Sequence, residues 1–145
     1  MHFNPYVNFY GRCEEALEFY KAALGGSYEI VMRAKDMPQS DEHQTPAGWE
    51  NKVLHSRFSF DGGEFLASDG QAGTTRPADS AISLCAQTKS ADEAKRIYAK
   101  LSEGGEIDMP MQETFWSPAF GMFTDKFGIY WMIGTFSEAS VPSAN

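Results

Sequence analysis

One order of predicted elements, strand-helix-strand-strand-strand, constrains this chain most, because it occurs twice within 145 residues. In each copy an amphipathic helix carries its apolar side chains at helical spacing and ends at a glycine pair. The pairs are Gly25-Gly26 and Gly104-Gly105, and Tyr20 and Tyr98 occupy similar places in the two helices. Self-similarity of this kind is typical of duplicated structural units, so the chain is expected to fold as two related modules.

The first copy is expected to hold four strands, one helix and one long loop. The strands are predicted over Phe3–Tyr10, Tyr28–Lys35, Val53–Phe60 and Glu64–Asp69, and the helix over Cys13–Leu24. The polar segment Asp36–Asn51 contains two prolines and predicts a loop of the length that is usually functional or mobile. Trp49 lies in that loop, where it either closes over a ligand or anchors an interface.

The second copy repeats the pattern. Strands are predicted over Ala81–Thr88, Ile107–Glu113, Ala119–Thr124 and Ile129–Thr135, and a helix over 91–102. Ser90 and Glu93 form a capping-box pattern that opens the helix. The last two strands join at a tight turn that begins with Asp125, which we interpret as a turn residue. Trp131 alternates with Met132 and is interpreted as a core residue.

Three strands after each helix predict an α+β fold, in which paired β-α-β-β-β modules form a curved sheet around a cleft. Residues 1–136 are expected to form a single domain of two modules, 3–70 and 81–136, and residues 137–145 a flexible tail. In the third predicted strand, apolar and polar side chains alternate. His55 and Arg57 therefore face away from the helix, toward the expected cavity.

Composition narrows the partners and the compartment. A net charge of -8 argues against nucleic acid or an anionic membrane surface as partner. No apolar run reaches the roughly 18 residues of a membrane span, and the first residues lack a signal-peptide pattern. Cys13 and Cys85 have no metal or redox spacing, so they predict two buried, reduced thiols in a cytoplasmic protein.

Short motifs spread along the chain resemble those of one superfamily. They are Pro5-Tyr6, Glu14-Glu15-Ala16-Leu17 with Phe19-Tyr20, Val53-Leu54-His55, Ala67-Ser68-Asp69, and Phe115-Trp116 with Asp125, Phe127, Gly128 and Trp131. In order and spacing the chain resembles the vicinal-oxygen-chelate superfamily of glyoxalases, bleomycin-resistance proteins and extradiol dioxygenases. Within it, the chain is similar to the PhnB-like branch, long described as 3-demethylubiquinone 3-methyltransferase-like.

The resemblance implies a glyoxalase-like fold, a homodimer and four positions where metal-dependent members hold their ion. Those positions fall on Pro5 (or Asn4 with a one-residue slip), Ala67, Ala81 and Met132. None of Pro, Ala and Met supplies the oxygen or imidazole that a hard divalent ion prefers. We therefore expect no tightly bound metal and no cofactor.

Five residues are candidates for contact with a small-molecule ligand: His55, Arg57, Asp69, Trp116 and Phe120. His55 either acts as an acid, base or anion contact, or is a hydrogen-bonded structural histidine. Asp69 either pairs with His55 or Arg57 or caps the turn that follows it. Trp116 and Phe120 either form the apolar wall of a pocket or pack in a core or dimer interface.

Three functions remain open at this stage. The first is a small-molecule-binding protein, which needs a cavity and no catalytic set. The second is a metal-independent enzyme, or an enzyme with an unrecognised metal site around His55 and Asp69. A methyltransferase is the least favoured, because a nucleotide site commonly uses a glycine-rich loop between a strand and a helix, and both glycine pairs follow helices.

Overall fold

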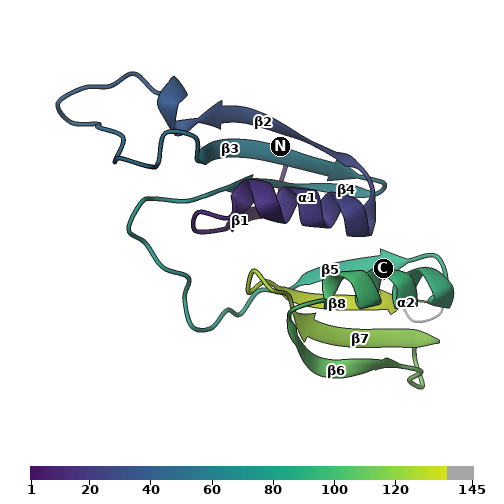
Figure 1. Cartoon of the computed structure of the whole chain (residues 1–145). Coiled ribbons are helices and arrows are strands. Elements are labelled where there is room, and N and C mark those ends of the chain that lie inside the picture. Colours follow the sequence, from purple (N-terminus) through teal and green to yellow (C-terminus); the bar gives the residue numbers. More distant parts are fainter. Residues whose placement is uncertain (137–145) are drawn as a thin grey trace. The chain divides into compact units, whose positions relative to one another are not determined.

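The computed structural model describes residues 1–136, which form two compact units, one from Met1 to Arg76 and one that begins at Pro77 (Figure 1). Each unit has a four-stranded mixed sheet and one α-helix. The strand order is β1-β4-β3-β2 in the first sheet and β5-β8-β7-β6 in the second. The two units therefore share one topology, as the sequence repeat predicts. No helix in the described residues is long and apolar enough to span a membrane.

The first unit consists of β1 (Tyr6–Asn8), α1 (Cys13–Leu24), β2 (Ser27–Arg33), the short 3-10 helix η1 (Ala34–Asp36), β3 (Val53–Phe60) and β4 (Gly63–Ser68). The second unit consists of β5 (Leu84–Thr88), α2 (Ala91–Leu101), β6 (Glu106–Gln112), β7 (Ala119–Thr124) and β8 (Tyr130–Thr135). In each sheet the first strand is parallel to the last, and the other pairs are antiparallel.

The predicted bounds of α1, β3 and β7 agree with the structure, whereas the first strand of each unit is shorter than predicted. β1 has three residues and β5 begins at Leu84 rather than Ala81. A strand can extend only as far as its partner, and β1 pairs with the last three residues of β4. Beyond β1 the chain turns at Tyr10, whose φ of 51° is unusual for a residue with a side chain. The predicted tail over 137–145 lies outside the described residues.

The core of the first unit forms between α1 and the adjacent sheet face. Tyr20 is fully buried and meets Phe58 and Phe65 edge-on, at ring centroid distances of 6.5 and 5.9 Å. Phe58 and Phe65 stack on each other at 5.1 Å across β3 and β4. Aromatic pairs in these arrangements add to the stabilisation from burial alone. The even-numbered face of β3 therefore packs on the helix, as its alternation predicts.

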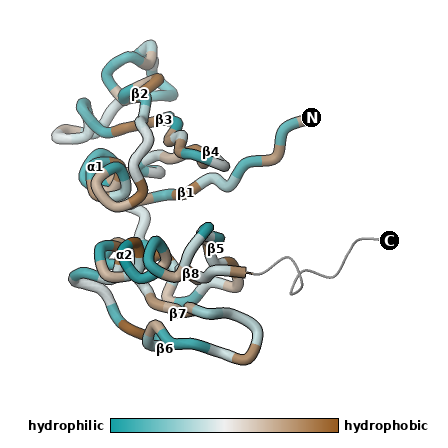
Figure 2. Tube along the Cα trace, turned by 90° about the vertical axis from the view of Figure 1, so that its right-hand side faces the viewer, coloured by the Kyte–Doolittle hydropathy of each residue, from teal (hydrophilic) through white to brown (hydrophobic). Residues whose placement is uncertain are grey.

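The second unit has an equivalent core with a closer approach of helix to sheet. Tyr98 of α2 meets Phe123 of β7 edge-on at 5.1 Å. Gly121 lies directly under Tyr98, where an added Cβ would be 2.6 Å from the ring. A side chain at Gly121 would therefore force the Tyr98 ring out of its place. Figure 2 shows that hydrophilic and hydrophobic residues alternate around both helices, in line with one buried and one exposed side.

The turn between β7 and β8 depends on a single buried carboxylate. Asp125 accepts hydrogen bonds from the backbone N–H of Phe127 and of Ile129, both at 2.9 Å, and from Trp131 Nε1 at 3.0 Å. Both Asp125 and Trp131 are buried. The interpretation of Asp125 as a turn residue and Trp131 as a core residue is thus confirmed, and one side chain links the two.

Replacing Asp125 with alanine should lower the free energy of unfolding by at least about 2 kcal/mol, because three donors, two of them buried, lose their acceptor. Urea denaturation followed by circular dichroism measures the change. Asp79→Ala is the matched control, since Asp79 is exposed, and it should change stability by less than about 0.5 kcal/mol. Equal stability of the two variants would contradict this assignment.

Candidate functional site

The face of the first sheet that lies away from α1 is polar. On this face Arg57 of β3 lies opposite Leu66 of β4. In the next pair, Ser59 lies opposite Glu64. Arg57 is exposed, and its Nε lies 3.8 Å from the Glu64 carboxylate. Both side chains are well solvated, at 52% and 38% exposure, so this ion pair contributes little to stability. The guanidinium can exchange Glu64 for an anionic ligand at small free-energy cost.

His55 lies on the same face and contacts an aromatic side chain from β1. The ring of Tyr6 stacks on His55 with centroids 5.9 Å apart and an interplanar angle of 24°. The Tyr6 hydroxyl lies 3.4 Å from His55 Nδ1 and donates to the carbonyl of Leu54 at 3.2 Å. A phenol and an imidazole in this arrangement can bind or transfer a proton at a bound ligand.

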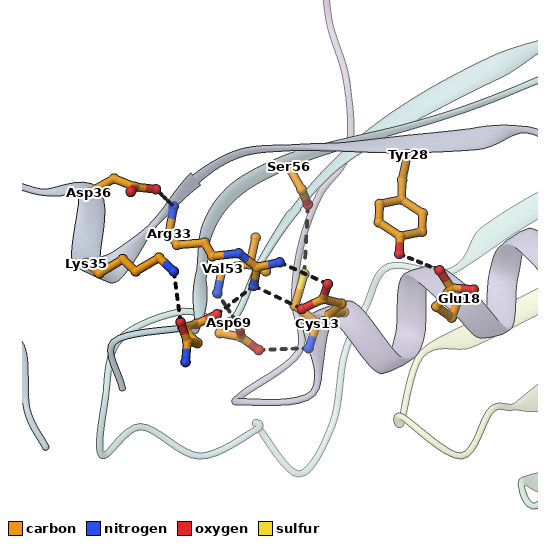
Figure 3. Close-up of polar contacts among 11 residues, drawn as sticks. Cys13, Glu18, Tyr28, Arg33, Lys35, Asp36, Val53, Ser56 and Asp69 are labelled. Carbon is orange, nitrogen blue, oxygen red and sulfur yellow. Dashed lines mark hydrogen bonds and ion pairs between the residues drawn. The ribbon is translucent and has the colours of Figure 1, made fainter. Parts of the chain in front are cut away.

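Asp69 has neither of the two roles that the sequence suggested, which were a pair with His55 or Arg57 and a cap on the turn that follows it. Its side chain is 2% exposed; one carboxylate oxygen accepts from Cys13 N at 2.7 Å and the other from Val53 N at 2.6 Å (Figure 3). It bonds neither His55 nor Arg57. Because Arg12 provides no side-chain cap, Asp69 satisfies the first N–H of α1 from a distant part of the chain. Asp69 is thus a structural acceptor that fixes the start of α1 beside the start of β3.

Further polar contacts fasten the base of the 37–52 loop to the beginning of α1. Arg33 makes a two-pronged ion pair with Glu14, with both N–O distances 2.9 Å, and donates to the carbonyl of Asn51 at 2.7 Å (Figure 3). The hydrogen bonds from Arg33 lower the pKa of Glu14. Lys52 Nζ donates to the carbonyl of Gly11 at 2.6 Å. Both ends of the loop are therefore anchored to one region.

The 37–52 loop and the adjacent ends of β3 and β4 line an open pocket of about 340 Å³. The lining residues are Ala34, Met37, Gln39, Glu42, His43, Gln44, Thr45, Pro46, Trp49, Leu54, Gly70, Gln71 and Ala72. The wall thus combines apolar side chains with uncharged polar ones, a carboxylate and an imidazole. This volume and this mixture are typical of small-molecule sites.

Internal hydrogen bonds give the loop a defined shape. Gln39 donates to the Thr45 hydroxyl at 2.9 Å and accepts from Thr45 N at 2.8 Å. The backbones of Ser40 and His43 bond each other in both directions. Trp49 is half-buried and packs near Gly11, where a Cβ would lie 3.6 Å from the indole. The pocket wall is therefore held by the loop itself and by the turn before α1.

The pocket and His55 adjoin at the start of β3, but on opposite faces of the sheet, and neither Tyr6, His55 nor Arg57 lines the pocket. Leu54 lines the pocket, and its carbonyl accepts the hydrogen bond from Tyr6, whose ring stacks on His55. The sequence identified His55 and drew attention to Trp49, but it did not predict the pocket. A loop without regular structure has no periodicity from which its fold follows, so the sequence carried no signal for the Gln39–Thr45 hydrogen bonds.

Trp116 and Phe120 form an aromatic cluster with Phe136 in the second unit. The Trp116 and Phe120 rings are 4.5 Å apart in an edge-to-face arrangement, and Trp116 stacks on Phe136 at 5.8 Å. Phe120 is buried, and an added Cβ at Gly134 would lie 2.8 Å from its ring. The two predicted residues therefore do lie together. They belong to the second unit, whereas His55, Arg57 and Asp69 belong to the first.

Two expectations from the sequence need correction. Cys85 was expected to be buried but is exposed, because β5 is an edge strand and Cys85 lies opposite Met132 rather than against α2. Cys13 is buried as expected, and burial raises its pKa to about 12.

Ala67, which the resemblance placed at a ligand position, is buried and lies opposite Ser56, whose hydroxyl approaches the Cys13 sulfur. It therefore faces α1.

The other implied metal positions hold no ligand side chain either. Pro5 precedes β1, Ala81 precedes β5, and Met132 lies within β8. Among residues 1–136, no group of three or more His, Cys, Asp or Glu side chains is arranged to hold a metal ion. The donor set of the described residues therefore does not fit a hard divalent ion at the superfamily's usual place.

Two β-α-β-β-β units with one helix on each sheet define the glyoxalase-like fold. Solved glyoxalase/bleomycin resistance/dioxygenase proteins share it, among them a domain from Frankia sp. EAN1pec, with a TM-score of 0.58 at 15% identity over 94% of this chain and 90% of that one. The sequence also matches the family described as 3-demethylubiquinone-9 3-methyltransferase over residues 1–134. The chain belongs to this PhnB-like family.

Relatives of this chain support the assignment along its whole length. Protein YjdN of Escherichia coli (strain K12) is 30% identical over 144 residues, which cover 95% of this chain and 97% of that protein. The crystal structure of protein PA1353 from Pseudomonas aeruginosa has a TM-score of 0.81 at 34% identity, covering 94% of this chain and 98% of that one. A putative 3-demethylubiquinone-9 3-methyltransferase, PhnB protein, from Bacillus cereus has a TM-score of 0.73 at 28% identity, with 93% and 99% coverage.

Replacing Asp69 with alanine should lower the free energy of unfolding by about 2 to 4 kcal/mol, because two buried N–H groups, one at a helix start, lose their acceptor. Chemical denaturation measures this loss. Asp41→Ala, in the exposed part of the loop, is the control and should be nearly neutral. An Asp69→Ala protein as stable as the control would show that the carboxylate has no structural role.

Proposed function

We propose that this protein binds a small molecule, with the 37–52 loop pocket and the adjoining His55 face as its site. The observation that carries the proposal is the pocket of about 340 Å³. Its lining residue Leu54 precedes His55 on β3, and the Tyr6–His55 pair lies on the other face of the sheet. Met37, Trp49 and Leu54 give it apolar surface. Such a site needs no metal and no catalytic set to retain a ligand.

The charges around the site favour a small ligand that is aromatic or partly anionic. The indole of Trp49 offers a flat apolar wall to a ligand in the pocket. His55 and Arg57 do not line the pocket, and they are the polar contacts that an anionic group would meet on the other face of β3. In the second unit, the half-buried ring of Trp116, backed by the buried ring of Phe120, is a further aromatic contact of the same kind. Asp69 supports the site by positioning the start of β3.

A metal-independent enzyme of the lyase or isomerase type is the second candidate. The observation in its favour is the Tyr6 hydroxyl, 3.4 Å from His55 Nδ1, since a phenol beside an imidazole is a suitable pair for general acid–base chemistry. Methyl transfer, which the family description names, is less favoured. The glycine pairs follow α1 and α2, so neither forms a strand-to-helix loop for a nucleotide.

We also propose that the protein is a cytoplasmic homodimer. Both cysteines are free thiols, which suits a reducing compartment. Each sheet has two edge strands, and such edges are usually covered. Several large apolar side chains are also exposed in the described residues: Phe3, Tyr6, Val31, Met32, Ile82, Ile107 and Phe115.

The site is tested with a panel of small aromatic carboxylates and their uncharged amides, scored by thermal shift and by isothermal titration. At least one carboxylate should bind, and both Trp49→Ala and His55→Ala should weaken that binding about tenfold or more, the effect of losing one good contact. His55→Ala should leave stability within about 1 kcal/mol, because the side chain is only half-buried. His2→Ala is the matched histidine control. Binding that both site variants retain would place the ligand elsewhere.

The dimer is tested by sedimentation velocity of the full chain at micromolar concentration. The expected mass is twice the 16.1 kDa of one chain. Replacing Val31 and Met32 with serine should shift the equilibrium toward the monomer, because both side chains expose apolar surface on β2. A single species of 16.1 kDa for the unaltered protein would exclude the dimer at that concentration.

A further inference from the structure

Four sulfur-containing side chains lie on neighbouring strands of the second sheet, one on each strand. Cys85 of β5 is the register partner of Met132 of β8. Met132 is in turn the partner of Met122 of β7, and Met122 is the partner of Met109 of β6. The row Cys85–Met132–Met122–Met109 therefore crosses the whole sheet along one line (strands in Figure 1). Three of the seven methionines of the chain belong to it.

The row lies on the face that α2 does not cover. The neighbours of Met132 and Met122 along their strands, Trp131 and Phe123, are buried and are partners of each other, and Phe123 packs on Tyr98 of α2. Because side chains alternate along a strand, Met132 and Met122 point to the opposite face. Cys85 is exposed and both methionines are partly exposed, so an ion from solvent can reach their sulfur atoms.

Thiolate and thioether sulfur are the soft donors that bind Cu(I) and other soft ions, whereas Mg²⁺, Ca²⁺ and Mn²⁺ prefer oxygen. Directly opposite residues of adjacent strands have Cβ atoms about 5 Å apart, which long methionine side chains can close. We propose that Cys85, Met132 and Met122 form a binding site for a soft monovalent metal ion of the Cu(I) class. Met109 is a further thioether beyond Met122.

The surroundings of the row suit such an ion. In the next row along the same strands, Gly134 pairs with Phe120, whose ring belongs to the aromatic cluster with Trp116 and Phe136. The next row on this face is therefore aromatic rather than charged.

Binding exchanges one proton for one ion without oxidation or reduction. The Cys85 thiol releases its proton to solvent as its sulfur binds the ion, and the two thioethers donate lone pairs without losing a proton. Affinity for the ion should therefore increase as the pH rises.

This site lies in the second unit and is independent of the ligand pocket proposed for the first. The test titrates the full chain anaerobically with Cu(I) against the chromophoric chelator bicinchoninate, with Ag(I) as a redox-inert second probe. One ion per chain should bind. Cys85→Ser should weaken binding about 100-fold or more, and Met132→Leu and Met122→Leu about tenfold or more each, since a tenfold change corresponds to loss of one moderate contact.

Met32→Leu is the matched control, because Met32 is also a partly exposed strand methionine but lies in the first sheet. It should bind Cu(I) as the unaltered protein does. Near-ultraviolet circular dichroism checks that every variant is folded. The proposal is overturned if the Cys85→Ser protein keeps its Cu(I) affinity, or if Met132→Leu and Met122→Leu both bind as tightly as Met32→Leu. The latter result would reduce the site to a single surface thiol.

Discussion

The first unit depends on the carboxylate of Asp69, which joins two places that are far apart in the sequence. It accepts the first N–H of α1 and the first N–H of β3, at 2.7 and 2.6 Å, from a position that water does not reach. A buried N–H without an acceptor is expensive, so the helix start and the strand start must stay together. The Arg33–Glu14 ion pair and the Lys52 hydrogen bond then place the 37–52 loop next to this joint. The pocket exists because both ends of the loop are fixed.

The two units have the same topology, but different side chains stabilise it in each. In the second unit, Ser90 caps α2 from within its own turn, and the buried carboxylate, Asp125, serves the β7–β8 turn instead. The faces away from the helices differ in chemistry as well. The first presents an imidazole and a guanidinium, whereas the second presents sulfur and aromatic rings. Because the two units share a fold but differ in the side chains on the sheet face away from the helix, one chain can carry two different kinds of site.

Membership of the family explains the fold of this chain, but it does not explain which side chains could bind a ligand or act on it. The chain keeps the β-α-β-β-β units, yet the four positions implied by the resemblance are Pro5, Ala67, Ala81 and Met132. Ala67 even faces the helix, because its strand pairs with β3 in the register that sets Ala67 opposite Ser56. A frame held by packing and backbone hydrogen bonds can lose a set of side-chain ligands without losing its shape. Function must therefore be argued from the side chains that are present.

The sequence by itself determined the repeat, the bounds of α1, β3 and β7, the outward direction of His55 and Arg57, and the turn role of Asp125. These follow from local periodicity and turn chemistry, which act over a few residues. Only the tertiary structure decided that Asp69 caps α1, that Cys85 is exposed, and that Gln39 and Thr45 shape a pocket. Each of these depends on contacts between distant residues, or on which strand lies at a sheet edge. The pattern of apolar and polar residues along the sequence predicts which face of a helix or strand a side chain lies on. It does not predict which distant residue the side chain contacts on that face.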